Sequence, residues 1–170
     1  MNIYKEIKEY DFKKNFDAKT AVIEKLKALL SNDKTKEVEA EIKALQDEWE
    51  DIGPTKQELW EEIKNEYWST VNSIYDRIRS HYDAVREKSQ GNITLKKELI
   101  ARTEALINQT RETEKDWENH TSKVLALQNE WKTIGFGPKK EDEGVWKVFR
   151  GLCDQFFDAK GEFYKVIRSE

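Results

Sequence analysis

Apolar residues recur at steps of three or four along most of the chain, the spacing that places side chains on one face of an α-helix. In the segment that ends at Gly53, the apolar positions are Val38, Ile42, Leu45, Trp49 and Ile52. A longer series with the same steps runs from Trp60 to Val85. The pattern predicts amphipathic helices and no β-sheet.

Helix boundaries are predicted by a glycine, a proline and a pair of polar residues. Gly53 follows Trp49 by one turn and is expected to form a left-handed C-terminal cap, and Pro54 cannot continue the helical hydrogen bonds. Thr55 and Glu58 have the spacing of a capping box. The sequence therefore predicts a new helix over residues 55–89.

The chain repeats itself. The sequence IKALQDEWEDIG at residues 42–53 returns as VLALQNEWKTIG at residues 124–135. Upstream, residues 15–30 resemble residues 92–107, with an asparagine first and a lysine four positions later in both. The fold class we expect is all-α, an elongated array of three-helix repeats in which antiparallel helical hairpins are joined by a long third helix.

The repeat also divides the chain. The IYKEIK sequence near the start resembles IYDRIR in the predicted third helix, and the helical pattern is still running at the last residue. We expect residues 1–14 to be the tail of a preceding repeat helix, 15–90 to be repeat 1, and 91–170 to be repeat 2, truncated at its C-terminal end. The chain is then a window cut from a longer array.

Each hairpin carries a pair of tryptophans that flank its turn, Trp49 with Trp60 and Trp131 with Trp146. The pairs should meet across the antiparallel hairpins as core packing, with a ligand groove as the alternative. The predicted structural core of the repeats comprises Leu45, Trp49, Ile52, Gly53, Trp60, Leu127, Trp131, Ile134, Gly135 and Trp146.

The ALQ-x-EW-x-x-IG block, followed by a proline and a Trp-led segment in both copies, resembles a bacterial repeat family catalogued as domain of unknown function 349. The resemblance covers roughly residues 34–90 and 112–170. No activity is assigned to that family, so the resemblance implies an architecture and not a chemistry. The first copy departs from the pattern, with Tyr67 where the second has Cys153.

Composition excludes several classes of protein. Charged residues make up 38% of the chain and there are only seven glycines and two prolines, too few for turn-rich sandwiches or glycine-rich nucleotide sites. A net charge of −4 gives no general attraction to nucleic acid or to anionic membranes. The N-terminal sequence lacks a signal-peptide apolar region and the longest apolar run is Val124–Leu127, so we expect a cytoplasmic protein without a membrane partner.

Nothing in the sequence indicates catalysis. Cys153 occupies the apolar-stripe position of Tyr67, which favours a core cysteine over a nucleophile. His81 and His120 lie on different predicted helices, without the converging ligands that a metal site needs. Most carboxylates lie off the apolar stripe. We expect no catalytic residues, no metal and no cofactor, and hence no enzyme.

Two features are candidates for binding. Tyr75, Arg79, Tyr82 and Arg86 share one face of a locally basic helix, an arrangement suited to phosphates and stacked bases, although they also fit a rim beside the core. Phe136 lies between two glycines in the longer second connection, either as a staple onto the preceding helix, which we favour, or as a mobile surface anchor.

These observations favour a non-enzymatic α-helical repeat module that acts as a protein-interaction scaffold, since long amphipathic helices offer extended surfaces. The alternative is an RNA- or ribosome-associated factor that uses the aromatic and basic face of the long helix. The expected partners are proteins and further repeats of the same parent chain, and nucleic acid is possible but not favoured.

Overall fold

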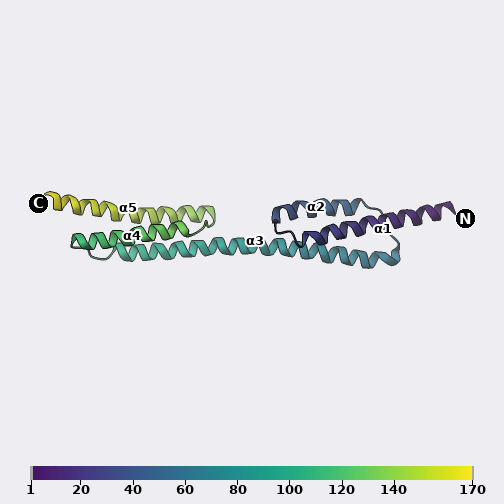
Figure 1. Ribbon diagram of the computed structural model, residues 1–170, viewed down its shortest axis with the longest axis horizontal. Coiled ribbons are helices and arrows are strands. Elements are labelled where there is room, and N and C mark those ends of the chain that lie inside the picture. The colour runs from purple at the N-terminus through teal and green to yellow at the C-terminus, as the bar shows by residue number, and fades with distance from the viewer. Residues whose placement is uncertain (1, 170) are drawn as a thin grey trace. The chain divides into compact units, whose positions relative to one another are not determined.

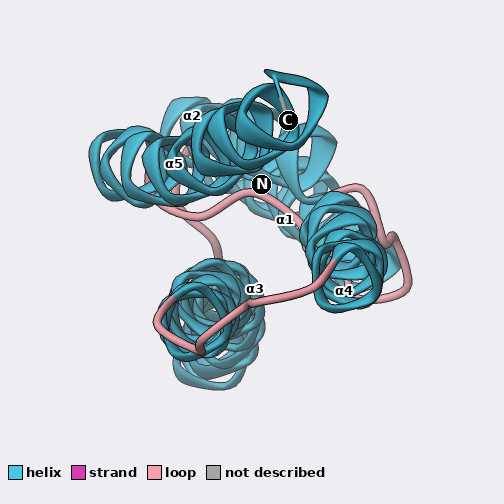
Figure 2. Cartoon of the chain, turned by 90° about the vertical axis from the view of Figure 1, so that its left-hand side faces the viewer, coloured by secondary structure: helices cyan, strands magenta, loops and turns pink. Residues whose placement is uncertain are grey.

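The computed structural model describes residues 2–169, and within them the chain forms helices joined by loops, without a strand (Figure 2). The helices are α1 (Ile3–Leu29), α2 (Thr35–Asp51), α3 (Gln57–Ile107), α4 (Glu114–Thr133) and α5 (Lys139–Ser169). The all-α fold class is confirmed.

The chain divides into two compact units, Met1–Asp83 and Ala84–Glu170. The first contains α1, α2 and the first part of α3, and the second contains the rest of α3 with α4 and α5 (Figure 1). Each unit therefore packs three helical segments around a core of its own, and α3 supplies residues to both.

The core of the first unit is built on the apolar stripe of α2. Val38, Ile42, Leu45 and Trp49 are all buried, as the pattern predicts. The Trp49 ring stacks on Tyr67 of α3 at 3.9 Å between ring centroids, and Trp60 lies 6.1 Å from Trp49. The predicted meeting of the two tryptophans across the hairpin is confirmed.

The second unit repeats this arrangement with different aromatic residues. Trp131 of α4 stacks on Phe149 of α5 at 4.3 Å, and its centroid lies 6.0 Å from that of Trp146. Val124, Leu127 and Trp131 are buried like their counterparts in α2. The second tryptophan pair therefore also meets as predicted.

The predicted end of the third helix at residue 89 is wrong, because α3 continues through Gly91 to Ile107. A glycine in a helix interior costs only about 1 kcal/mol relative to alanine. Apolar residues on both sides of Gly91, such as Ile74 and Leu99, are buried in their units. Tertiary packing on either side therefore overrides the local preference.

The predicted left-handed cap at Gly53 is also wrong, because no described glycine, Gly135 of the second copy included, has a positive φ. Both glycines instead make room for an asparagine. A Cβ atom at Gly53 would lie 2.8 Å from Nδ2 of Asn15, and one at Gly135 would lie 2.9 Å from Nδ2 of Asn92. Close approach, and not backbone conformation, is the reason for glycine at both positions.

Each of these asparagines ties the first helical segment of its unit to the connection that follows the glycine. Asn15 Nδ2 donates to the carbonyl oxygen of Pro54 at 2.8 Å, and Asn92 Nδ2 donates to that of Phe136 at 2.9 Å. The same residue type thus makes the same kind of contact once in each unit.

The capping box predicted at Thr55 and Glu58 does not form, because α3 begins at Gln57 and the Lys56 carbonyl accepts its first helical hydrogen bonds. A capping box does form at the start of α4. There the Asp116 amide donates to Thr113 Oγ1 at 3.1 Å, and Asp116 Oδ2 accepts from the Thr113 amide at 3.1 Å.

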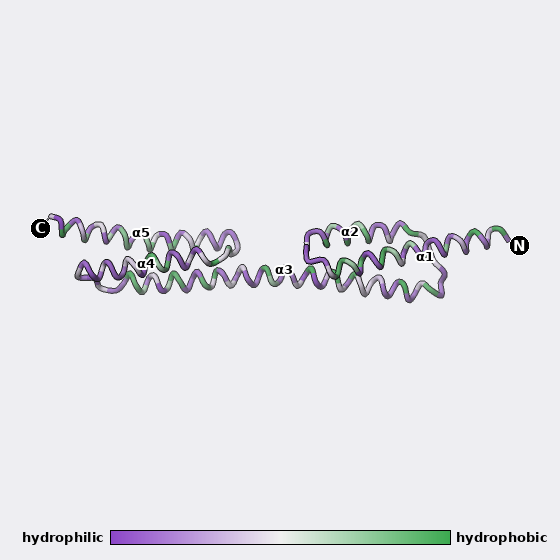
Figure 3. Tube along the Cα trace, in the orientation of Figure 1, coloured by the Kyte–Doolittle hydropathy of each residue, from purple (hydrophilic) through white to green (hydrophobic). Residues whose placement is uncertain are grey.

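Hydrophobic and hydrophilic residues alternate along every helix (Figure 3). Among residues 2–169, no helix combines the length and the apolar character needed to cross a membrane.

Candidate functional site

Phe136 is the most exposed large apolar side chain of the second unit, with 87% of its surface accessible. The favoured prediction, that Phe136 staples onto the preceding helix, is therefore wrong. The Asn92 hydrogen bond holds the backbone of Phe136 against α3, so its side chain faces solvent while its carbonyl faces the helix. The alternative of a surface anchor matches this orientation.

The glycines beside Phe136 let the loop approach α3 closely. Gly135 leaves room for the Asn92 side chain, and a Cβ atom at Gly137 would overlap the side chain of Ile93 and lie 3.2 Å from the Ser89 carbonyl oxygen. The loop therefore lies directly on α3 at two points. The Phe136 backbone thus has contacts with α3 on both sides, and such contacts lower the entropy that a partner must remove on binding.

Phe136 forms one wall of an apolar groove in the second unit. Trp131, Ile134 and Trp146 line the same groove, whose volume is about 360 Å³. Trp146 is 46% exposed, so it lies at the edge of the core and not at its centre. An exposed phenylalanine beside a half-exposed tryptophan is the combination enriched at the centres of protein interfaces.

The floor of the groove contains a buried ion pair. Lys96 Nζ of α3 lies 2.6 Å from Asp142 Oδ1 of α5, with only 6% and 17% of the two side chains exposed. The Lys96 ammonium also lies 5.2 Å from the ring centroid of Trp131 and 5.9 Å from that of Phe136. Since the charges of Lys96 and Asp142 neutralise each other, this pair does not attract a ligand of either charge.

The first unit has the same lysine without the carboxylate. Lys19 follows Asn15 by four positions, as Lys96 follows Asn92. Its ammonium lies 4.6 Å from the ring of Trp49 and 4.3 Å from that of Trp60. Among the described residues, no carboxylate lies within ion-pair distance of Lys19. Desolvation by burial lowers the pKa of Lys19, an effect that Glu50 partly opposes.

The predicted aromatic and basic face of α3 is largely engaged within the chain. Tyr75 is half-buried and its hydroxyl donates to Gln46 Oε1 of α2 at 2.7 Å. Arg79 pairs with Asp76 at 3.0 Å.

Tyr82 and Arg86, the other two residues of the predicted face, also interact with other parts of the chain. A side-chain interaction with Glu39 raises the pKa of Tyr82. Arg86 belongs to the second unit and also takes part in an interaction within the described chain. Four side chains that share a helix face in the sequence are thus each engaged, and Tyr75 belongs to the rim of the first core.

The remaining core candidates fall into three groups by burial. Leu45, Trp49, Leu127 and Trp131 are buried, and Ile52, Gly53, Trp60 and Ile134 are half-buried. Gly135 and Trp146 are exposed. The exposed pair lies beside Phe136, so the predicted core of the second repeat includes part of the candidate surface.

Cys153 is buried in the core of the second unit, where desolvation raises the pKa of its thiol. A buried thiol with a raised pKa is a poor nucleophile. Among residues 2–169, no group of three histidine, cysteine or carboxylate side chains is placed to hold a metal ion.

Sequence reasoning missed a cluster around Arg111, in the connection between α3 and α4. Arg111 donates to the Leu106 and Ile107 carbonyl oxygens at 3.1 and 2.9 Å, and its guanidinium lies 4.5 Å from the Trp117 ring. Arg111 Nη1 also lies 3.1 Å from His120 Nδ1. Burial and the neighbouring Arg111 charge lower the pKa of His120. Connections differ between the two copies, so the repeat carries no signal for this cluster.

No curated protein and no solved structure gives a significant match to the chain. A family model described as Domain of Unknown Function (DUF349) matches residues 1–58 and again residues 62–140. The two matches cover most of the chain and each includes one copy of the repeated block with its tryptophan and glycine. The chain therefore belongs to the DUF349 family, of which it contains two tandem copies.

Proposed function

We propose that this chain is a non-enzymatic α-helical repeat module that acts as a protein-interaction scaffold, and that the groove at Phe136 is a contact surface for a partner protein. The observation that carries the proposal is the exposure of Phe136 on a backbone that Asn92 and the two flanking glycines hold against α3. The ring adds to the exposed part of Trp146 in one groove, and contiguous exposed apolar surface is typical of interaction sites.

The chemistry of the groove favours a protein over a nucleic acid. Four of its lining residues are aromatic or aliphatic, Lys132 and Glu143 add charges of opposite sign, and the Lys96 ammonium is already paired with Asp142. A nucleic-acid site would present an excess of positive charge to phosphates, whereas the charged residues of this groove balance. The alternative face on α3 is a weaker candidate for RNA, because Tyr75 and Arg79 have partners of their own.

The proposal also covers cofactors, partners and location. We expect no cofactor, and partners that are proteins, among them further repeats of the same parent chain. A cytoplasmic location fits a chain whose single cysteine is reduced and buried.

The proposal is tested by affinity capture from the cells that make the protein, with wild-type, Phe136→Ala and Val148→Ala chains as baits. Val148 is an exposed apolar residue of the same unit that lies outside the groove, so Val148→Ala is the matched control. Phe136→Ala should leave thermal stability unchanged and abolish capture of a protein that the control still captures. Captured protein that Phe136→Ala retains, or that nuclease releases, contradicts the proposal.

A further inference from the structure

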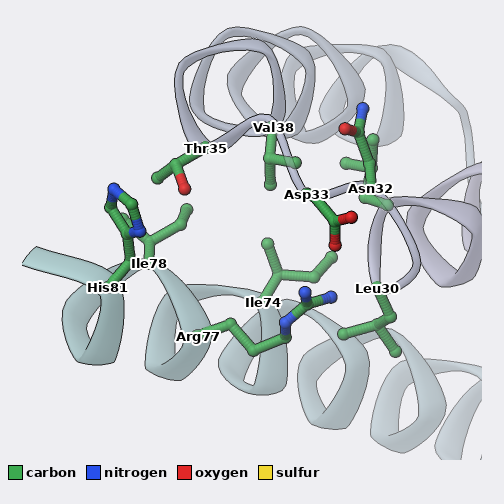
Figure 4. Close-up of a pocket in the computed structure, with 10 residues that line it drawn as sticks. Leu30, Asn32, Asp33, Thr35, Val38, Ile74, Arg77, Ile78 and His81 are labelled. Carbon is green, nitrogen blue, oxygen red and sulfur yellow. The ribbon is translucent and has the colours of Figure 1, made fainter. Parts of the chain in front are cut away.

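The first unit contains a pocket of about 230 Å³ where the end of α1, the beginning of α2 and residues 74–81 of α3 come together (Figure 4). Val38, Ile74 and Ile78 form an apolar floor, but most of the accessible lining is polar, from residues such as Asn32, Asp33 and Arg77. Thr35 and His81 lie at its rim. A cavity of roughly 150 Å³ is sufficient for benzene, so this pocket has room for a larger aromatic ring.

In the second unit, the same place is filled from within the chain. When Trp49 is aligned with Trp131, Thr35 corresponds to Trp117. When Trp60 is aligned with Trp146, Arg77 corresponds to Phe163. Trp117 is buried, and its ring lies 5.3 Å from that of Phe163. Two large aromatic side chains in the second unit are thus replaced in the first by a small residue and a flexible one, and both replacements line the pocket.

In the second unit, where Trp117 fills this place, the guanidinium of Arg111 lies over its ring. The Arg111 guanidinium lies 4.5 Å from the Trp117 ring centroid, in the range of a cation–π interaction. The corresponding connection in the first unit, residues 30–34, contains no arginine. Arg77 supplies a guanidinium from another direction, since its side chain extends along the wall of the pocket (Figure 4).

Arg77 is available for this role. Among residues 2–169, no carboxylate lies within ion-pair distance of its guanidinium, whereas Arg79 two positions later is paired with Asp76. The Asp33 carboxylate points toward the pocket from the opposite rim (Figure 4). A ring inserted between them would have a cation at its face and an acceptor for a ring N–H. The indole of Trp117 lacks such an acceptor, because its Nε1 is buried without a hydrogen-bond partner.

We propose that this pocket binds a tryptophan side chain that a partner protein inserts from an exposed segment, in the place that Trp117 occupies in the second unit. The apolar floor receives the ring, Arg77 covers its face and Asp33 accepts from the indole N–H. The charges of Arg77 and Asp33 are opposite, so the pocket selects for the ring and not for the charge of the flanking peptide. The proposal does not depend on the groove at Phe136, which belongs to the other unit.

The test is a titration of the whole ¹⁵N-labelled chain with the capped tripeptide acetyl-Gly-Trp-Gly-amide, followed by amide chemical shifts. We expect saturable shifts confined to residues 29–38 and 74–81, with a dissociation constant on the order of 1 mM, the strength that a ligand of this size reaches. The same peptide with leucine or alanine in place of tryptophan should bind at least several-fold more weakly.

Two variants locate the site. Thr35→Trp places in the first unit the residue that the second unit has, and should abolish the shifts by filling the pocket. Arg77→Gln leaves the apolar floor intact and should weaken binding by about 2- to 5-fold, the loss of one exposed cation–π contact. Arg150→Gln, at an exposed arginine of the second unit, is the matched control and should bind like the wild type.

Three results overturn the proposal. The first is shifts that are absent from the pocket or equally large with the alanine peptide. The second is binding that Thr35→Trp and Arg77→Gln both leave unchanged. The third is concentration-dependent association of the chain in sedimentation that Thr35→Trp abolishes, because the occupant would then be a second copy of this chain and not a partner protein.

Discussion

The ion pair between Lys96 and Asp142 gives the sharpest stability prediction, because the first unit has the same lysine without the acid. Asp142→Ala leaves the Lys96 ammonium buried, with the Trp131 ring at 5.2 Å and the Phe136 ring at 5.9 Å as its remaining favourable contacts. Removing one partner of a buried pair costs about 3–5 kcal/mol. The rings offset about 1 kcal/mol of this, and loss of an acid in the first turn of α5 adds up to about 1 kcal/mol.

We therefore expect Asp142→Ala to lower the free energy of unfolding of the second unit by about 3 kcal/mol. Lys96→Met combined with Asp142→Ala should recover most of this loss, because an apolar pair replaces an ionic pair of similar volume. Lys19→Met, the matched variant in the first unit, should be neutral or stabilising. Burial lowers the pKa of Lys19, so the charged form of that residue is already disfavoured by folding.

The assay is native-state hydrogen exchange, because it reports each unit separately. Amides of α4 should lose protection in Asp142→Ala while those of α2 keep theirs. A loss below about 1 kcal/mol, or a double variant no more stable than the single one, would refute the reasoning, since either result means that the ammonium does not need its carboxylate.

Three further predictions concern the two cores. Burial and Arg111 lower the pKa of His120 in the folded state, so the unfolded chain binds the proton more readily. The stability of the second unit should therefore fall as the pH drops below about 6.5, and His120→Val should remove this pH dependence. Denaturation at several pH values measures the effect. Gly53→Ala should cost about 1 kcal/mol, because displacing Asn15 breaks its hydrogen bond to Pro54, and should cost less when Asn15→Ala is already present, a coupling that a double-mutant cycle in urea detects. Trp49→Ala should cost roughly 3–5 kcal/mol as a large truncation of a buried ring, and a loss below about 1 kcal/mol in thermal unfolding would mean that the ring is not part of the core.

The helices and their buried faces could be predicted from the sequence because both depend on spacing. Ile42 and Val124 occupy the centre of the α2 and α4 stripes, and neither exposes any surface. Local signals at the helix ends were less reliable. A glycine such as Gly91 indicates a helix end, yet α3 continues through it, because packing on both sides outweighs the cost of about 1 kcal/mol that glycine adds to a helix interior.

The candidate site was predicted only in part. The sequence drew attention to Phe136 and its glycines, but the favoured prediction was a staple onto the preceding helix and not a surface anchor. The reason for its exposure is tertiary: Asn92 and Ile93 occupy the space beside the loop and turn the ring outward. The asparagine that opens both upstream segments, Asn15 and Asn92, was the one sequence signal for that contact. The pocket in the first unit has no signal of its own, since only the comparison with Trp117 shows what is missing there.

The most direct test of the interaction function is site-specific photo-crosslinking in the cells that make the protein, with benzoyl-phenylalanine at position 136 and, as the control, at position 148. The account predicts a discrete protein adduct from position 136 that nuclease treatment leaves intact and that position 148 does not form. An adduct that contains nucleic acid, or the same faint background from both positions, would contradict it.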